Sequence, residues 1–317
     1  MTPPDLVAHA DWGSAPAKRW MATAHLTARG TYRVAAPEPV GPLETWTERV
    51  GARAPGGRIL AGFDFPIGLP AAYALRAGIA DFRAALLRFG QGDWAAFYRL
   101  AERPDEIGLR RPFYPRRPGG TKRQHLVDGI GVPGFADLLR RCDRATPERG
   151  AAGALFWTMG AQQSGRAAIV GWRDVIAPAL REGSGTTRLW PFDGDLGALL
   201  AEPGLVFCEA YPAEAALHLG LAPPGRGWSK RRQSDRATLA APLLAWAERR
   251  AVALSRELER LLREGFGAGA EGEDLFDSVL GLFGMLEVAT AHRSEGVPDD
   301  AAVREVEGWI LGLTPTR

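Results

Sequence analysis

The residues of this sequence with the clearest chemical potential are carboxylates that stand next to apolar segments. Asp11 ends the run LVAHAD, Asp64 stands inside GFDFPIG, and Glu209 stands inside VFCEAYP. Asp274 and Asp277 begin the apolar run DLFDSVLGLFGM, and their spacing places both on one face of a helix. An ionised carboxylate beside apolar sequence is costly to desolvate unless a cation or hydrogen bonds compensate it.

Each acid also has a structural explanation when it is taken alone. Asp11 could begin a turn before Gly and Ser, and Asp64 could brace a loop before Phe-Pro. Glu209 could pair with an arginine, and Asp274 could interact favourably with a helix macrodipole. The combination favours one shared site, because acids that follow the strands of an open α/β sheet gather at the edge where ligands bind.

Clustered carboxylates predict a site for a hard divalent cation. Their like charges repel one another, and Mg²⁺ or Mn²⁺ relieves that repulsion and prefers oxygen ligands. The two cysteines, Cys142 and Cys208, stand far apart in the sequence, and the five histidines show no paired metal-ligand spacing. We therefore expect Mg²⁺ or Mn²⁺ as cofactor. The expected metal ligands are Asp11, Asp64, Asp274 and Asp277.

Strands that could position these acids follow from the hydrophobic pattern. Turn residues separate Leu6 to Asp11, Arg19 to Leu26 and Tyr32 to Ala35, which predicts an antiparallel meander. The apolar runs at 58–65 and 205–210 predict strands that are buried on both faces. Strands separated by helical segments pair in parallel, so a mixed sheet is expected.

The rest of the chain is predicted to be mostly helical. Residues 102–190 are rich in Pro, Gly, Arg and Trp, which indicates a lobe inserted at roughly 90–200 into a single domain of residues 1–317. The fold class is therefore α/β, a mixed sheet flanked by helices with an inserted helical and loop-rich lobe. Helical spacing predicts helices over 43–53, 71–101, 213–219, 234–264, 273–292 and 300–313.

Two basic segments are candidates for phosphate binding. LRRPFYPRRPGGTKR interleaves cations with Phe113 and Tyr114, which suits a nucleic-acid strand whose bases stack on rings, although a solvated loop explains it equally well. RGWSKRRQSDR contains a serine that can cap a helix whose N-terminus binds anions. The candidate substrate-binding residues are Arg116, Arg117, Lys122, Lys230, Arg231 and Arg232.

Composition excludes several classes of protein. The 317 residues are 46% apolar, which is enough for a sizeable core and excludes disorder over most of the length. No run approaches the ~20 apolar residues of a membrane helix, and the start of the chain lacks the features of a secretory signal. Two cysteines fit a reducing compartment, so we expect a cytoplasmic protein. The net charge of +2 does not by itself predict a nucleic-acid partner.

The segments AHADWGS, AGFDFPIGLP, FCEAYPAEA and GEDLFDSVLGLFGM resemble those of the DUF429 family. Its members are predicted nucleases with a ribonuclease H-like fold, related in layout to RuvC-type resolvases. RPFYPRRPGG, LFWTMGAQQSG and SKRRQSDR resemble further blocks of a subgroup, so the resemblance spans most of the chain. It implies that Asp274 and Asp277 are the DxxD pair at the head of the final catalytic helix. Asp11 would be the acid of the first strand, and the choice between Asp64 and Glu209 as metal ligand stays open.

The resemblance implies hydrolysis of phosphodiester bonds. Two divalent ions about 4 Å apart would activate a water and stabilise the leaving oxygen, with Asp11 bridging them. One alternative is a small-molecule, nucleotide-like phosphohydrolase that uses the same cleft. Another is a non-catalytic protein that binds nucleic acid through the basic segments. The candidate catalytic residues are Asp11, Asp64, Glu209, Asp274 and Asp277.

Overall fold

The computed structural model describes residues 2–54, 56–146, 149–159, 164–183, 185–221 and 227–315. Residues 160–163 of LFWTMGAQQSG therefore lie outside the described residues. The chain divides into two compact units, one of Met1–Asp64 with Leu196–Glu295 and the other of Phe65–Asp195 with Gly296–Arg317. The second unit begins earlier than the lobe predicted at roughly 90–200, and it also includes the C-terminal segment.

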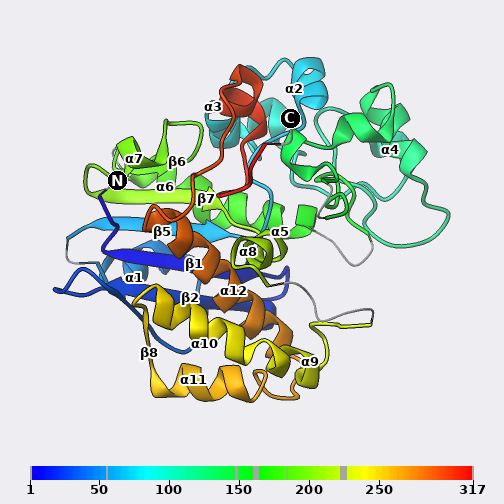
Figure 1. The fold of residues 1–317 in the computed structure, drawn as a ribbon. Coiled ribbons are helices and arrows are strands. Elements are labelled where there is room, and N and C mark those ends of the chain that lie inside the picture. The colour runs from blue at the N-terminus through cyan, green and yellow to red at the C-terminus, as the bar shows by residue number, and fades with distance from the viewer. Residues whose placement is uncertain are drawn as a thin grey trace. The chain divides into compact units, whose positions relative to one another are not determined.

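The first unit is built on a mixed sheet (Figure 1). Strands β1 (Leu6–Trp12), β2 (Arg19–Leu26) and β3 (Tyr32–Val34) form the predicted antiparallel meander. Strands β5 (Arg58–Phe63) and β7 (Gly204–Glu209) continue the sheet in parallel on the other side of β1. The strand order β7-β5-β1-β2-β3, with β8 (Ala253–Leu254) next to β3, confirms the predicted α/β class with a mixed sheet.

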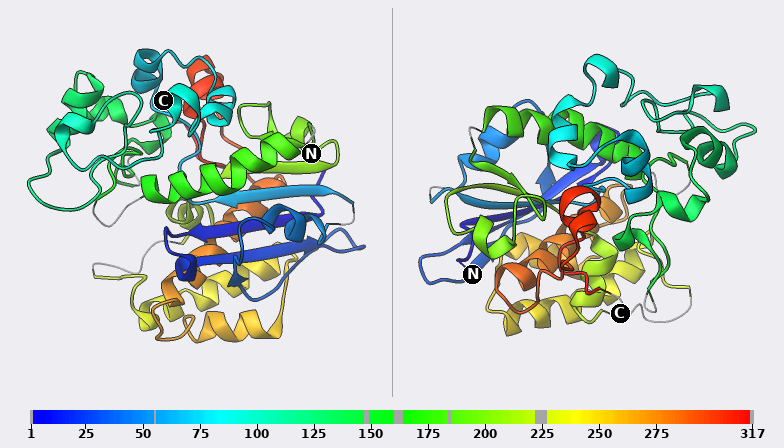
Figure 2. Two further views of the ribbon diagram at one scale, coloured as in Figure 1. Left: turned by 180° about the vertical axis from the view of Figure 1, so that it is seen from behind. Right: turned by 90° about the horizontal axis from the view of Figure 1, so that it is seen from above.

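Helices cover both faces of this sheet. Helix α12 (Gly272–Ala289) lies across one face, in contact with β1, β2, β5 and α8 (Pro212–His218) (Figure 1). Helix α1 (Trp46–Gly51) covers the other face (Figure 2). The Trp46 ring of this helix lies 5.5 Å from the Phe63 ring and 6.1 Å from the Phe207 ring. Since side chains alternate along a strand, each strand residue points either to the α12 side or to the α1 side of the sheet.

Glycines let α12 pack closely on the sheet. A Cβ at Gly281 would lie 2.1 Å from Cε1 of His9, and a Cβ at Gly284 would lie 2.5 Å from Cβ of Ala215. On the facing strand, a Cβ at Gly62 would lie 2.4 Å from Sδ of Met285. Any larger residue at these positions would push α12 away from β1, β5 or α8.

The prediction of one long helix over 234–264 is wrong. The chain forms α9 (Gln233–Thr238), α10 (Ala240–Arg249), strand β8 (Ala253–Leu254) and α11 (Arg256–Arg263). Ala251 has a φ of 52°, which ends α10. Residue Ala253 then pairs with Arg33 of β3, and the Ser255 hydroxyl accepts a hydrogen bond of 3.2 Å from the Leu258 N–H to cap α11.

Other predicted helices are shorter in the structure. Helix α1 occupies only part of 43–53, and the helix predicted at 300–313 is reduced mainly to the π-helical turn Val303–Glu307, which Gly308 ends at a φ of 68°. The prediction at 213–219 corresponds to α8 and that at 273–292 to α12. Among the described residues, no helix is long and apolar enough to cross a membrane.

The second unit is a helical and loop-rich assembly with an aromatic core. Rings in this core pack closely, for example Phe89 on Phe97 at 3.6 Å between centroids and Phe82 on Trp172 at 5.1 Å. Its helices and strand are α2 (Ala71–Ala77), α3 (Phe82–Arg88), α4 (Arg123–Ile130), α5 (Ser164–Gly171), α6 (Ala177–Glu182) and β6 (Thr187–Leu189). The first unit also contains the 3-10 helix Pro16–Lys18, strand β4 (Glu38–Pro39), which pairs with β2, and helix α7 (Leu196–Leu199).

Candidate carboxylate site

Two of the predicted acids come from the carboxyl ends of adjacent parallel strands. Ala10 of β1 pairs with Phe63 of β5, so Asp11 and Asp64 follow one residue later on neighbouring chains. Oδ1 of Asp64 accepts a hydrogen bond of 2.8 Å from the Trp12 N–H, and its carboxylate also shares a hydrogen bond with Asp11. Asp11 is only 9% exposed, and Asp64 beside it is partly exposed.

The N-terminal part of α12 adds two further acids. Burial raises the pKa of Asp11 well above its ordinary value, and the negative charges of Asp64, Asp277 and Asp274 raise it further, in that order. Burial is also the main cause of the raised pKa of Asp64 and of Asp277, which is 5% exposed. The structure therefore brings together the four acids that the sequence predicted as metal ligands.

A buried histidine fixes α12 against the strand that carries Asp11. The His9 ring lies between two carbonyl oxygens, with Nδ1 3.0 Å from Ser278 O of α12 and Nε2 3.0 Å from Ala210 O. Burial lowers the pKa of His9 to about 4, although the two carbonyl oxygens act in the opposite direction. Gly281 gives the ring its space. His9 therefore sets the spacing between β1 and α12 from within the core.

Two lysines compensate the carboxylates. The Lys230 ammonium contacts the Asp277 carboxylate and lies 3.3 Å from Oε1 of Glu273. The Lys18 ammonium lies 3.0 Å from Oδ2 of Asp274 and donates to the Ala270 carbonyl at 3.1 Å. Neither Lys18 nor Glu273 is among the site residues predicted from the sequence. The amino-acid composition does distinguish Lys18, because Lys18, Lys122 and Lys230 are the only lysines among the 39 lysine and arginine residues of the sequence.

Glu209 does not join the cluster. It pairs with Phe63 in the parallel register of β5 and β7, and Phe63 faces α1. Partners in a sheet register point to the same face, whereas Asp11 lies two residues from His9 and faces α12. Glu209 therefore lies on the opposite face of the sheet from Asp11, and Asp64 is the acid of the neighbouring strand that reaches the site.

The six basic residues predicted to bind substrate fall into two groups, one in each unit. Lys230 is turned toward the acids, whereas Arg231 is 73% exposed, with Nε 4.0 Å from Oε2 of Glu273, and Arg232 pairs with Asp235. The others belong to the second unit, where they are exposed: Arg116 and Arg117, which both pair with Glu102, and Lys122.

The prediction that bases stack on Phe113 and Tyr114 is wrong. Both rings are buried: Phe113 packs on Phe97 and Phe156, and the Tyr114 hydroxyl lies 2.9 Å from Nδ1 of His125. Alternating cations and rings in a sequence cannot distinguish a solvated platform from a chain segment whose aromatic residues anchor it to a core.

The donor set of the site consists of carboxylate oxygens, which a hard cation prefers. Asp11 and Asp277 offer buried carboxylate oxygens and Asp64 a partly exposed carboxylate, and the positive charge of Lys230 lies beside them. Within the described part of the chain, no three His, Cys, Asp or Glu side chains form a group that could hold a metal ion as they stand. Comparison with protein-family models, curated proteins and solved structures finds no match to this chain.

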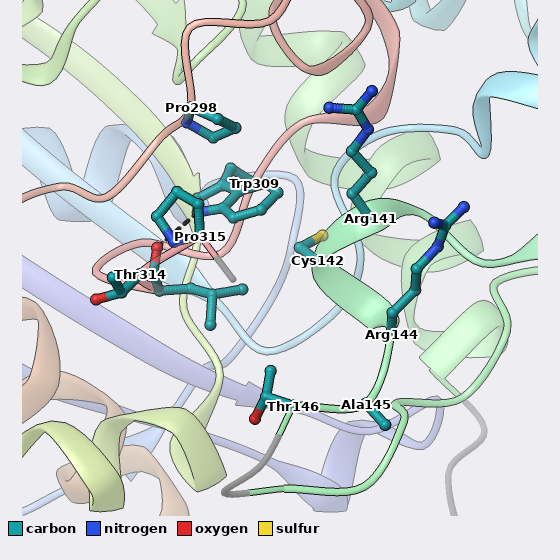
Figure 3. Close-up of a pocket in the computed structure, with 10 residues that line it drawn as sticks. Arg141, Cys142, Arg144, Ala145, Thr146, Pro298, Trp309, Thr314 and Pro315 are labelled. Atoms are coloured by element: carbon teal, nitrogen blue, oxygen red, sulfur yellow. Dashed lines mark hydrogen bonds between the residues drawn. The ribbon is translucent and has the colours of Figure 1, made fainter. Parts of the chain in front are cut away.

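The second unit contains a separate pocket of about 280 Å³ (Figure 3). Arg141 at its edge is paired with Asp300 at 2.8 Å, and the Trp309 indole N–H donates to the Leu313 carbonyl at 2.8 Å. Of the described residues that line it, none is one of the predicted site residues. The lining is Arg141, Cys142, Arg144, Ala145, Thr146, Pro298, Trp309, Leu313, Thr314 and Pro315.

Proposed function

We propose that this chain is a divalent-metal-dependent phosphodiesterase that hydrolyses nucleic acid. One observation carries the proposal: burial raises the pKa of Asp11, and the negative charges of Asp64 and Asp277 raise it further. A buried set of repelling carboxylates destabilises the folded chain, and perturbed acids of this kind concentrate at functional sites. A divalent cation would compensate these carboxylates and would give the cluster a catalytic role.

The order of elements supports a ribonuclease H-like fold. Three antiparallel strands are followed by strands parallel to β1 on its other side, and α12 delivers its acids next to β1. This is the layout that the resemblance to DUF429 proteins implies. The acids then lie at the carboxyl ends of β1 and β5, where ligands of α/β sheets bind.

The chain's own groups have distinct parts in the proposed reaction. Asp11, Asp64 and Asp277 would hold Mg²⁺ or Mn²⁺, with Asp274 nearer the solvent. A cation bound there would supply a water of lowered pKa close to the scissile phosphate. The Trp12 N–H orients the Asp64 carboxylate. Exposed Arg231 would contact phosphates of the substrate backbone.

The test is cleavage of single- and double-stranded DNA and RNA with Mg²⁺ or Mn²⁺, with chelator as the blank. Loss of a group that merely orients a metal ligand costs 10- to 100-fold, so Asp11→Asn and Asp277→Asn should each lower the rate about 100-fold or more. Asp128→Asn removes an exposed carboxylate of the second unit and serves as the control. Thermal unfolding checks that each variant is folded.

The outcomes separate the candidate functions. Cation-dependent cleavage that survives both Asp11→Asn and Asp277→Asn would refute the assignment of the site. Turnover of small nucleotide phosphoesters without cleavage of polymers, when abolished by the same two variants, would keep the site and change the substrate class.

A further inference from the structure

We infer that Lys230 is a tethered cation that occupies the metal's place at Asp277 in the cation-free protein and withdraws when a divalent ion binds. The inference rests on the proposed function, because it assigns a role toward the metal proposed there. It makes Lys230 a residue that sets metal affinity, a role different from that of the phosphate contacts expected from the sequence.

The first support is the position of the ammonium group. The Lys230 side chain is 45% exposed, and its ammonium group contacts the carboxylate of Asp277, whose side chain is only 7% exposed. It is also 3.3 Å from Glu273 and contributes a positive charge at Asp11. A single ammonium therefore compensates several acids at the place where the metal is proposed to bind.

The second support is the anchoring of the Lys230 backbone. The buried Arg236 guanidinium donates to the carbonyls of Lys230 at 2.5 Å, Gly265 at 2.9 Å and Gly267 at 2.7 Å. The neighbouring Ser229 N–H donates to Asp235 at 2.8 Å. None of these bonds uses the Lys230 side chain, so the ammonium can leave Asp277 by rotation of its own carbon chain.

The third support is the choice of residue. Basic residues of this chain are otherwise almost all arginine, yet lysines contact Asp274 and Asp277. A lysine ammonium is a compact charge on a flexible stem, whereas an arginine forms a planar, bidentate pair with a carboxylate that is harder to displace. Lysine is thus the better residue for a contact that must be broken by an incoming cation.

The consequence is competition between two cations for Asp277. Metal binding must break the ion pair between half-exposed Lys230 and Asp277. Removal of the Lys230 charge should therefore tighten metal binding by about tenfold. Lys230→Met keeps most of the apolar stem and removes the charge. Arg231→Met removes the same charge from the next residue, which lies 4.0 Å from Glu273, and is the matched control.

The experiment is calorimetric titration of Mn²⁺ into the full chain, for the wild type and these two variants, with Asp277→Asn to identify the site. We expect Lys230→Met to lower the Kd about tenfold and Arg231→Met to change it less than about twofold. Thermal unfolding provides a second measurement. Without metal, Lys230→Met should unfold at a lower temperature than the wild type, and saturating Mn²⁺ should narrow the difference.

Equal or weaker Mn²⁺ binding by Lys230→Met, in a protein whose wild type binds at Asp277, overturns the inference and leaves the proposed function standing. Absence of Mn²⁺ binding in the wild type and in every variant overturns both. Should Lys230→Met fail to fold, Lys230→Gln keeps a hydrogen-bond donor at Asp277 and gives the same comparison.

Discussion

Replacement of Gly281 by alanine tests whether close packing of α12 on β1 builds the carboxylate site. The new Cβ would lie 2.1 Å from Cε1 and 2.3 Å from Nε2 of the His9 ring. That ring cannot step aside cheaply, because both nitrogens lie 3.0 Å from carbonyl oxygens, those of Ser278 and Ala210. The helix must therefore move outward and carry Asp277 away from Asp11.

The expected cost follows from two opposing effects. Overpacking of a core costs about 1–3 kcal/mol and sometimes more. Gly→Ala inside a helix returns up to about 1 kcal/mol of helix propensity. We expect Gly281→Ala to destabilise the first unit by about 1 kcal/mol and to weaken Mn²⁺ binding. In α7, Gly197→Ala meets no atom within 4 Å and should be neutral or slightly stabilising, which makes it the matched control.

The assays are urea unfolding followed by circular dichroism, and hydrogen exchange of the α12 amides as a local measure. The double variant His9→Ala/Gly281→Ala removes the ring that the methyl group meets. The two changes should therefore be coupled by about 1 kcal/mol or more in the favourable direction. A Gly281→Ala protein as stable as Gly197→Ala, or strictly additive effects in the double variant, would refute the packing argument.

Three further predictions concern charge. Burial lowers the pKa of His218 below its ordinary 6.5 despite its hydrogen bond with Glu214. The contribution of neutral His218 to the free energy of unfolding is therefore fully present above pH 6.5 and is lost as the pH falls toward the folded pKa. In urea unfolding, His218→Gln should make this loss with falling pH smaller. Glu209→Gln should keep the Mn²⁺ affinity of the wild type in calorimetry, because Glu209 lies on the other face of the sheet; a loss like that of Asp11→Asn would contradict the register argument. Replacement of Arg231 and Arg232 by alanine should make the negative slope of log K against log salt for nucleic-acid binding less steep by about 1.4–1.8. An unchanged slope would show that these two arginines do not contact the nucleic acid.

The strands and the acids could be predicted because their signals are local. An apolar run ended by an acid and Gly or Pro marks the end of a buried strand, and this placed Asp11 and Asp64 correctly. The spacing of Asp274 and Asp277 placed both at the start of α12. Which acids share a face depends on strand register, which the sequence does not specify, so Glu209 could not be separated from Asp64.

The break inside 234–264 was hidden for a related reason. Leu243 and Trp246 of α10 and Leu258 and Leu262 of α11 are all buried, so helical spacing continues across the break. Helices usually end at glycine, whereas here Ala251 takes the positive φ. The chain accepts that strain where the next residues pair with β3, a long-range contact that no local pattern reports.

The two lysines show why the charge balance of a site is harder to predict than its acids. Lys18 approaches Asp274 across more than 250 residues of sequence, from the turn between β1 and β2. In that turn the Gly13 N–H donates to the Lys18 carbonyl at 3.0 Å, and Arg19 donates to the Gly13 carbonyl at 2.8 Å. Backbone bonds therefore set where Lys18 lies, just as the Arg236 contacts set where Lys230 lies. In both cases hydrogen bonds fix the position of the main chain, whereas the flexible side chain allows the ammonium group to move when the charge of the site changes.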